Sequence, residues 1–398
     1  MGNSKFDKLL DYSLLTFIIL WSGGCVTYGM WNDWPLHMLP MLVILFAYRK
    51  CKFDISSFIP MIVISLIVFA QMIAYNGAPI SAYRVALITL DMSLATLILK
   101  DNFVCYYTRI IYFFAVTSLA LYLFDIFGGH STLLSISQFF PQGGREIMSE
   151  FDFSQEASRT LWIYQVRDAG GFDYIRNSGP FWEAGRLTIY LNIALFLCLF
   201  HYKYKLSSRE VILLVVCNLT TVSTTGYITM ILILMFYSFK GNMSNQAKIV
   251  STICVTIFLY FILQADFMTD KIGGEMASDE TYSRFGAMAY HFTQIVQAPI
   301  LGFGPYLSHV FNFDLAISPN GITDSLRYFG IPCTLYLWYL LYKGSYLYLN
   351  KMSKSAHFVY LFVVLLLAFT QTITNSPFYY LLYFMGALRQ NTSSYEKS

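Results

Sequence analysis

The sequence predicts an all-α polytopic membrane protein with about twelve transmembrane helices. Of its 398 residues, 56% are hydrophobic and only 12% are charged, which is about half the charged fraction of an ordinary soluble domain. The apolar residues fall in repeated blocks, and a helix needs about 20 residues to cross the hydrocarbon of a bilayer. Because lipid offers a backbone no hydrogen-bond partner, each block is expected to be helical.

The predicted spans begin at the amino terminus, where a charged start and an apolar stretch without a convincing cleavage site indicate a retained first helix. Ser223-Thr224-Thr225-Gly226 interrupts one apolar block, so we expect two short spans joined there as a tight hairpin. In chain order the spans cover residues 12–30, 35–48, 56–75, 80–98, 103–127, 187–201, 210–223, 226–240, 248–265, 322–342, 357–374 and 377–388.

Lysine and arginine gather on alternate connections between these spans, and the other short connections hold none. Because cytoplasmic connections are enriched in these residues, both termini are predicted to be cytoplasmic and the number of spans even. Two long connections then lie outside, and their mixture of aromatic and charged residues is not typical of a linker. The predicted parts of this one integral membrane domain are an N-terminal bundle (1–127), a first long external loop (128–186), central helices (187–265), a second long external loop (266–321) and C-terminal helices (322–398).

The first candidate site is the segment Arg176-Asn-Ser-Gly179-Pro-Phe-Trp182-Glu183-Ala-Gly-Arg186, directly before a predicted span. A guanidinium group binds phosphate oxygens through a bidentate fork that an ammonium group cannot match. A nearby carboxylate is able to take a proton from a sugar hydroxyl. The alternative is an interfacial belt, because Trp and Arg are common at the ends of spans for solvation alone.

The second candidate site begins with Ser283-Arg284 on an amphipathic stretch and continues through Pro299 to Gly302 and Gly304. Pro299 is expected to end a helix, and the two glycines permit a close backbone approach or a positive φ beside the membrane. A helix lying on the membrane surface explains the same pattern without catalysis. The two glycines are not a dinucleotide fingerprint, because no strand precedes them and no third glycine follows at the required spacing.

Ionisable residues also fall inside predicted spans. Arg84 and Asp91 belong to the span 80–98, and Arg109 belongs to the next one. Charges at that depth are costly, so they should face protein or water and pair with one another. We therefore expect a structural ion pair between helices, with a role in substrate binding as the minority alternative.

Signals for metals, nucleotides and nucleic acid are weak. His291 and His309 have no Cys or His partner at metal-ligand spacing. The nearest approach to an Asp-x-Asp pair is Glu150-Phe-Asp152, and no Walker A lysine motif is present. The net charge of +3 is small. We predict a chain that uses no cofactor, holds no metal and binds no nucleic acid.

Several motif segments follow one another in a fixed order along the chain. They are Arg176-x-x-Gly179-x-Phe181-Trp182-Glu183-x-Gly185, Ser223-Thr-Thr-Gly226-Tyr227-Ile, Ser283-Arg284, Pro299-Ile-Leu-Gly302-Phe-Gly304, and Ser318-Pro-Asn320-Gly321 with Gly330. Taken together, over roughly residues 170–345, they resemble bacterial O-antigen polymerases of the Wzy type. The related O-antigen ligases share the Arg-x-x-Gly opening but usually carry His-Pro where this chain has Glu183-Ala184, which favours the polymerase. In polymerases Pro often follows the Glu, and this chain has Ala184 there.

The resemblance implies a C-type glycosyltransferase (GT-C) architecture in the bacterial inner membrane, with the active site facing the periplasm. It implies polymerisation of undecaprenyl-pyrophosphate-linked oligosaccharide repeat units into O-antigen, in lipopolysaccharide biosynthesis, alongside a chain-length regulator and a flippase. Glu183 would be the general base, and Arg176 and Arg284 would bind the donor pyrophosphate. The competing structural role for Glu183 is an ion pair with Arg176 or Arg186. Further candidate substrate-binding residues are Arg186, Trp182, Gly179, Gly302, Gly304, His309 and Asn320.

Two other functions stay open. An O-antigen ligase would transfer finished glycan to lipid A core. A flippase for lipid-linked oligosaccharides also has about a dozen spans, but such transporters usually have repeated halves and short, balanced loops. The two long, unequal loops expected here favour catalysis over transport.

Overall fold

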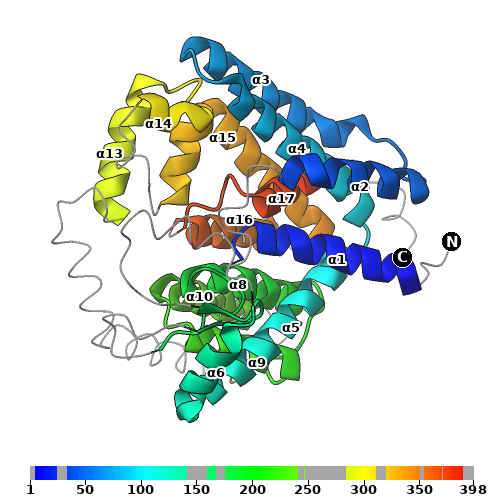
Figure 1. Cartoon of the computed structure of the whole chain (residues 1–398), viewed down its shortest axis with the longest axis vertical. Coiled ribbons are helices and arrows are strands. Elements are labelled where there is room, and N and C mark those ends of the chain that lie inside the picture. The colour runs from blue at the N-terminus through cyan, green and yellow to red at the C-terminus, as the bar shows by residue number, and fades with distance from the viewer. Residues whose placement is uncertain are drawn as a thin grey trace.

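The computed structural model describes residues 5–24, 34–140, 159–166, 175–240, 246, 284–310, 320–349, 354–369 and 371–388. These residues form an all-α protein with one two-stranded antiparallel hairpin (Figure 1). Its helices are α1 (Lys5–Trp21), α2 (Trp34–Tyr48), α3 (Ile59–Ala74), α4 (Pro79–Leu99), α5 (Phe103–Phe124), α6 (His130–Ser137), α8 (Ala184–Phe200), α9 (Arg209–Thr220), α10 (Thr224–Lys240), α13 (Arg284–Gln297), α14 (Leu307–Val310), α15 (Gly321–Tyr348), α16 (Lys354–Ala368) and α17 (Pro377–Ala387). The hairpin strands are β1 (Arg159–Thr160) and β2 (Gln165–Val166).

Three helical stretches in the described part of the chain are long and apolar enough to cross a membrane: Ile55–Ala74, Pro79–Leu99 and Phe103–Ser137. Four shorter apolar helices are α2, α8, α16 and residues Thr224–Phe239 of α10. Large apolar side chains also lie on the outside, and Leu66 and Ile73 of α3 are 66% and 77% exposed. An outer surface of this kind fits association with a lipid bilayer.

Most predicted spans coincide with a helix, and the differences are at their ends. Pro79–Leu99 and Trp34–Tyr48 each lie within one residue of their predictions. By contrast, α1 ends at Trp21 although the prediction extended to 30, and α16 ends at Ala368 although the prediction extended to 374. The prediction 248–265 lies outside the described residues.

The first long loop was predicted to begin at residue 128, but helical structure continues to Ser137. A π-turn over Asp125–Gly129 joins α5 to α6, and Gly128 within it has φ +103°. Glycine adopts this backbone conformation without the steric penalty that other residues meet. The chain therefore bends at Gly128 and continues as α6 instead of becoming irregular.

Two groups of helices surround a central set (Figure 1). One group contains α2, α3, α4, α13 and α15, and the other contains α5, α6, α8, α9 and α10. Between them, α17 packs against α15, α4 and α1, while α16 packs against α8, α10 and α15. The sequence of α17, PFYYLLYFMGA, is apolar all round, and every residue of it is buried, as expected for a helix enclosed by others.

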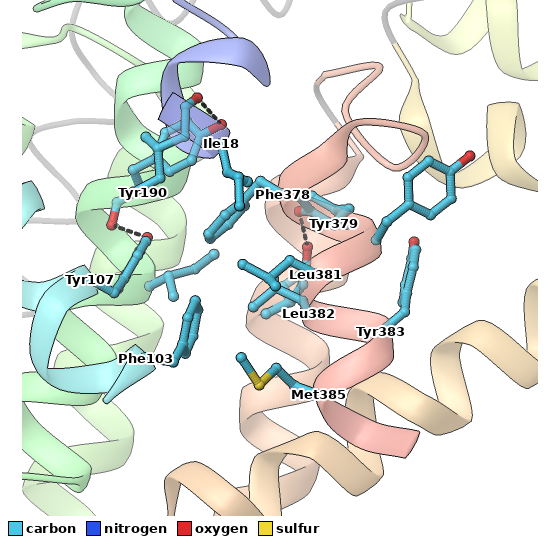
Figure 2. Packing of buried hydrophobic residues seen from close by; sticks show 14 of the residues in the cluster. Ile18, Phe103, Tyr107, Tyr190, Phe378, Tyr379, Leu381, Leu382, Tyr383 and Met385 are labelled. Carbon is cyan, nitrogen blue, oxygen red and sulfur yellow. Dashed lines mark hydrogen bonds between the residues drawn. The ribbon is translucent and has the colours of Figure 1, made fainter. Parts of the chain in front are cut away.

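Aromatic rings join α17 to α5 and α8 (Figure 2). The rings of Tyr107 and Phe378 stack with centroids 5.4 Å apart, and the Tyr107 hydroxyl donates a hydrogen bond of 3.0 Å to the carbonyl of Tyr190. At the start of α17, the amide of Phe378 donates to Ser22 Oγ over 2.7 Å. These contacts bring the ends of α1, α8 and α17 together.

Candidate active site

The segment that precedes α8 is held against the end of α9. The amide of Asn177 donates to the carbonyl of Thr220 over 3.0 Å, and its side-chain amide donates to Thr220 Oγ1 over 3.0 Å. Asn177 Oδ1 accepts the backbone amide of Gly179, which has φ +54°. An Asn side chain bonded to the backbone two residues on, followed by a residue in the left-handed region, forms a tight turn that favours glycine.

After this turn the chain contacts the end of α1. Phe181 forms an antiparallel bridge with Gly24, and the amide of Trp182 donates to the carbonyl of Gly23 over 3.0 Å. The Phe181 ring lies on that of Tyr190 in α8, with centroids 4.4 Å apart and an interplanar angle of 9°. The next residue, Glu183, is thereby placed where α1 ends and α8 begins.

Glu183 directly precedes α8 with an extended backbone, and its side chain does not cap the helix. Instead, its Oε2 accepts a hydrogen bond of 2.8 Å from Nε2 of Gln371, which lies in the connection between α16 and α17. Arg186, in the first turn of α8, donates from Nε to Gln371 Oε1 over 3.4 Å. The carboxylate and the guanidinium are thus joined through one amide.

The competing structural role for Glu183, a direct ion pair, is not found within the described part of the chain. Among the described residues, Glu183 forms no ion pair with Arg176 or Arg186. Arg176 instead donates from Nε to the carbonyl of Thr221 over 3.1 Å, at the C-terminal end of α9. A basic side chain there satisfies a carbonyl that the helix leaves unpaired, so Arg176 anchors its loop to α9.

A second polar cluster lies at the start of α15. Asp324 and Arg327 form a buried ion pair, and Arg327 Nη1 donates to Gln294 Oε1 of α13 over 3.0 Å. Asn375, in the connection between α16 and α17, donates from Nδ2 to Asp324 Oδ2 over 3.3 Å. The same connection that contacts Glu183 therefore also contacts this cluster.

The stretch that forms α13 was predicted to be amphipathic, and two of its polar side chains, His291 and Gln294, face the protein. His291 is buried and its Nδ1 lies 2.7 Å from Thr323 Oγ1 of α15. Burial, reinforced by the Arg327 guanidinium, lowers the pKa of His291 to about 3. On the outer side, Phe292 and Val296 are 48% and 76% exposed. A helix that turns apolar side chains outward fits contact with lipid.

Gly302 and Gly304 both have positive φ, of +66° and +58°. A Cβ on Gly302 would lie 2.5 Å from the amide nitrogen of Gly330, and a Cβ on Gly304 would clash with the Gln71 side chain. Gln71 donates from Nε2 to the carbonyls of Leu301 and Tyr328 over 2.6 and 2.7 Å. In the structure these two glycines allow a loop to pack between α3 and α15. Their predicted contact with substrate stays a prediction.

The remaining candidates are placed as follows. Asn320 caps α15, with Oδ1 accepting the amides of Ile322 and Thr323. Arg284 is the first residue of α13 and His309 lies in α14, but their side chains lie outside what the structure describes. The predicted roles of Arg284 and His309 in binding the substrate therefore stay predictions.

Residues that the sequence did not single out include Gln371 and Asn375. The first was assigned to the end of the predicted span 357–374 and the second to a two-residue connection. The signal was present in the run TQTITNSP that ends at Pro377, because so many polar residues do not fit hydrocarbon and Pro favours the first turn of a helix.

No group of three or more His, Cys, Asp or Glu residues that could hold a metal ion occurs within the described residues. Comparisons with protein-family models, with curated proteins and with solved structures find no match to this chain.

Proposed function

We propose that this chain is a glycosyltransferase that polymerises lipid-linked oligosaccharide repeat units into a surface polysaccharide of the O-antigen type. The donor would be the growing chain on undecaprenyl pyrophosphate, and the acceptor a new lipid-linked unit. In this proposal the chain has twelve spans in a GT-C architecture within the bacterial inner membrane. The site at Glu183 faces the periplasm, beside a flippase and a chain-length regulator as partners.

The observation that carries the proposal is the half-buried carboxylate of Glu183. One of its oxygens, Oε2, is engaged by Gln371, and among the described residues Oε1 has no hydrogen-bond partner. An oxygen in that state is available to accept a proton. Arg186 donates a hydrogen bond to the same Gln371 side chain, so its guanidinium group places positive charge near Glu183 for an anionic donor.

The chemistry requires one proton acceptor and stabilisation of one leaving group. The acceptor hydroxyl oxygen attacks the anomeric carbon of the donor sugar while its proton passes to Glu183. The bond from the anomeric carbon to the pyrophosphate oxygen breaks, and undecaprenyl pyrophosphate leaves with that electron pair. Arg176, Arg186 and Arg284 would stabilise the negative charge through guanidinium hydrogen bonds. Because the leaving group is already a pyrophosphate, the reaction needs no nucleotide.

The decisive experiment uses purified protein reconstituted with lipid-linked repeat units. Glu183→Gln keeps the shape of the side chain and removes the base, so the polymerisation rate should fall by about 10²- to 10⁴-fold. Glu210→Gln, at the start of α9, is a matched control and should polymerise at the normal rate. Normal polymerisation by folded Glu183→Gln protein would eliminate the assignment of the base.

The same preparation separates the alternatives. A ligase would transfer the glycan only when lipid A core is supplied, and would not join one lipid-linked unit to another. A flippase would move the lipid-linked unit across vesicle membranes without extending it. Chain extension with lipid-linked units as the only substrate supports the polymerase.

A further inference from the structure

Gln371 lies in a compact turn that fixes where its side chain starts. Its amide donates to the carbonyl of Ala368 over 3.2 Å, and its own carbonyl accepts the amide of Ile373 over 2.8 Å. Thr374 Oγ1 donates to the carbonyl of Gly321 over 3.1 Å, which attaches the turn to α15. Gln371 is only 9% exposed. Its side chain therefore enters the site from a rigid support.

The two contacts of the Gln371 amide determine its orientation. Its NH₂ group faces the Glu183 carboxylate and its oxygen faces the Arg186 guanidinium. A carboxylate only accepts hydrogen bonds and a guanidinium only donates them. Rotating the amide by 180° would place its oxygen against the carboxylate oxygens and its NH₂ group against the guanidinium donors. One orientation of the Gln371 amide is therefore strongly favoured.

Gly185 provides separate evidence that the amide must come close to α8. A Cβ at this position would lie 2.9 Å from Gln371 Nε2, closer than such atoms approach without displacement. Gly185 has no positive φ, so its backbone conformation does not call for glycine. A methyl group at Gly185 would therefore displace the end of the Gln371 side chain.

We propose that Gln371 is the positioning residue of Glu183, an inference that rests on the proposed function. Its NH₂ group fixes the carboxylate through Oε2 and directs Oε1 toward the acceptor hydroxyl. Its bridge also keeps Arg186 from pairing directly with the carboxylate.

Gln371→Leu removes the hydrogen bonds and keeps a side chain of similar length. We expect kcat to fall about 10- to 100-fold, the usual effect of losing a residue that orients a reacting group, with KM changed by less than about threefold. Gly185→Ala keeps every polar group but displaces the amide, so it should reproduce this fall in kcat. Gln138→Ala, on the exposed end of α6, is the matched control and should behave as the wild type.

A measurement that does not depend on catalysis separates this inference from the proposed function. A water-soluble carbodiimide labels the carboxyl group of Glu183, and mass spectrometry of the peptide follows the rate of labelling at one fixed pH. Because the carboxyl group is no longer held by the Gln371 amide, labelling should be faster in Gln371→Leu and Gly185→Ala but not in Gln138→Ala. An unchanged rate of labelling in both variants would overturn the positioning role, whatever the activity. Faster labelling in variants of a protein that makes no polymer would leave the positioning role standing and refute the polymerase.

Discussion

Arg327 Nη2 lies 2.8 Å from Asp324 Oδ1, with only 1% of the arginine side chain and 7% of the aspartate side chain exposed. The pair is three residues apart on α15, and both partners make further bonds, Arg327 to Gln294 and Asp324 to Asn375. Three segments of the chain, α13, α15 and the α16–α17 connection, thus meet at one buried charge pair. This cluster supports the connection from which Gln371 extends.

Asp324→Asn should destabilise the protein strongly. It leaves the Arg327 guanidinium buried without its counter-charge, a change that typically costs about 3–5 kcal/mol. Thermal unfolding in detergent measures the effect as a lower midpoint. Asp101→Asn, at an exposed position, should leave the midpoint unchanged. If Asp324→Asn unfolds at the same temperature as the wild type, the ion pair does not stabilise the fold.

Asp91→Asn should raise the unfolding temperature or leave it unchanged. The ion pair expected between helices is not found among the described residues: Asp91 is fully buried in α4, and neither of its carboxylate oxygens has a hydrogen-bond partner there. Arg109 instead donates to the Tyr12 hydroxyl over 3.0 Å. Because burying an unpaired carboxyl is costly, an amide there should cost less.

The thermal midpoint of Asp91→Asn in the same detergent is the measurement, with Arg84→Ala as the comparison. If Arg84 and Asp91 stabilised each other, both changes would lower the midpoint. A fall of several degrees in Asp91→Asn would show that the carboxylate has a stabilising partner.

Most helices could be predicted because the need to satisfy backbone hydrogen bonds in lipid acts within each apolar block. An apolar block in lipid has to satisfy its own backbone, so composition alone locates α4 to within one residue of the prediction 80–98. The ends are less certain where polar residues follow an apolar block. The prediction 357–374 ran past Ala368 because the threonines that follow are compatible with a span end.

The candidate site could be predicted only in part. Glu183 and Arg186 lie in one short segment, so a local pattern is enough to find them. The contact between Glu183 and Gln371 joins residues 188 positions apart, and no periodicity or motif in a single sequence connects them. The ion pair expected among Arg84, Asp91 and Arg109 is a different case, because the cost of charge inside a span predicts that partners are needed but does not determine which side chains meet.

Lowering the pH should destabilise the wild-type protein more than it destabilises the His291→Gln variant. Burial lowers the pKa of His291 from 6.5 to about 3, and the charged groups that face it from α15 are Arg327 and Asp324. Below pH 6.5 the unfolded chain binds a proton at this residue that the folded chain does not bind. Stability is therefore lost as pH falls from about 6.5 toward 3, by up to about 1.4 kcal/mol per pH unit.

Unfolding midpoints between pH 7.5 and 5 give the comparison. The slope against pH should be smaller in His291→Gln than in the wild type. His37→Gln, at an exposed position on α2, should keep the wild-type slope. Equal slopes in all three proteins would mean that His291 becomes protonated in the folded state.

Single cysteines placed in the two long loops should react from outside the cell. The alternation of lysine and arginine along the chain predicts that both loops lie on the periplasmic side. Glu150→Cys and Glu275→Cys should therefore be labelled by an impermeant thiol reagent in intact spheroplasts. Lys205→Cys, between α8 and α9, is the control and should react only after the membrane is opened. Protection of both loop cysteines would overturn the predicted topology.

Arg176→Lys should lose as much polymerisation activity as Arg176→Ala. In the structure Arg176 uses Nε to bind the carbonyl of Thr221. The prediction is that the same planar guanidinium group also binds a pyrophosphate oxygen of the donor. An ammonium group is a point charge without this fork. We expect both variants to lose about 10²- to 10³-fold in polymerisation rate, the usual effect of removing a donor that stabilises developing negative charge.

Rates with lipid-linked repeat units, compared at equal amounts of folded protein, measure this loss. Full activity in Arg176→Lys would show that charge alone suffices at this position, and full activity in Arg176→Ala would remove Arg176 from the binding site for the donor.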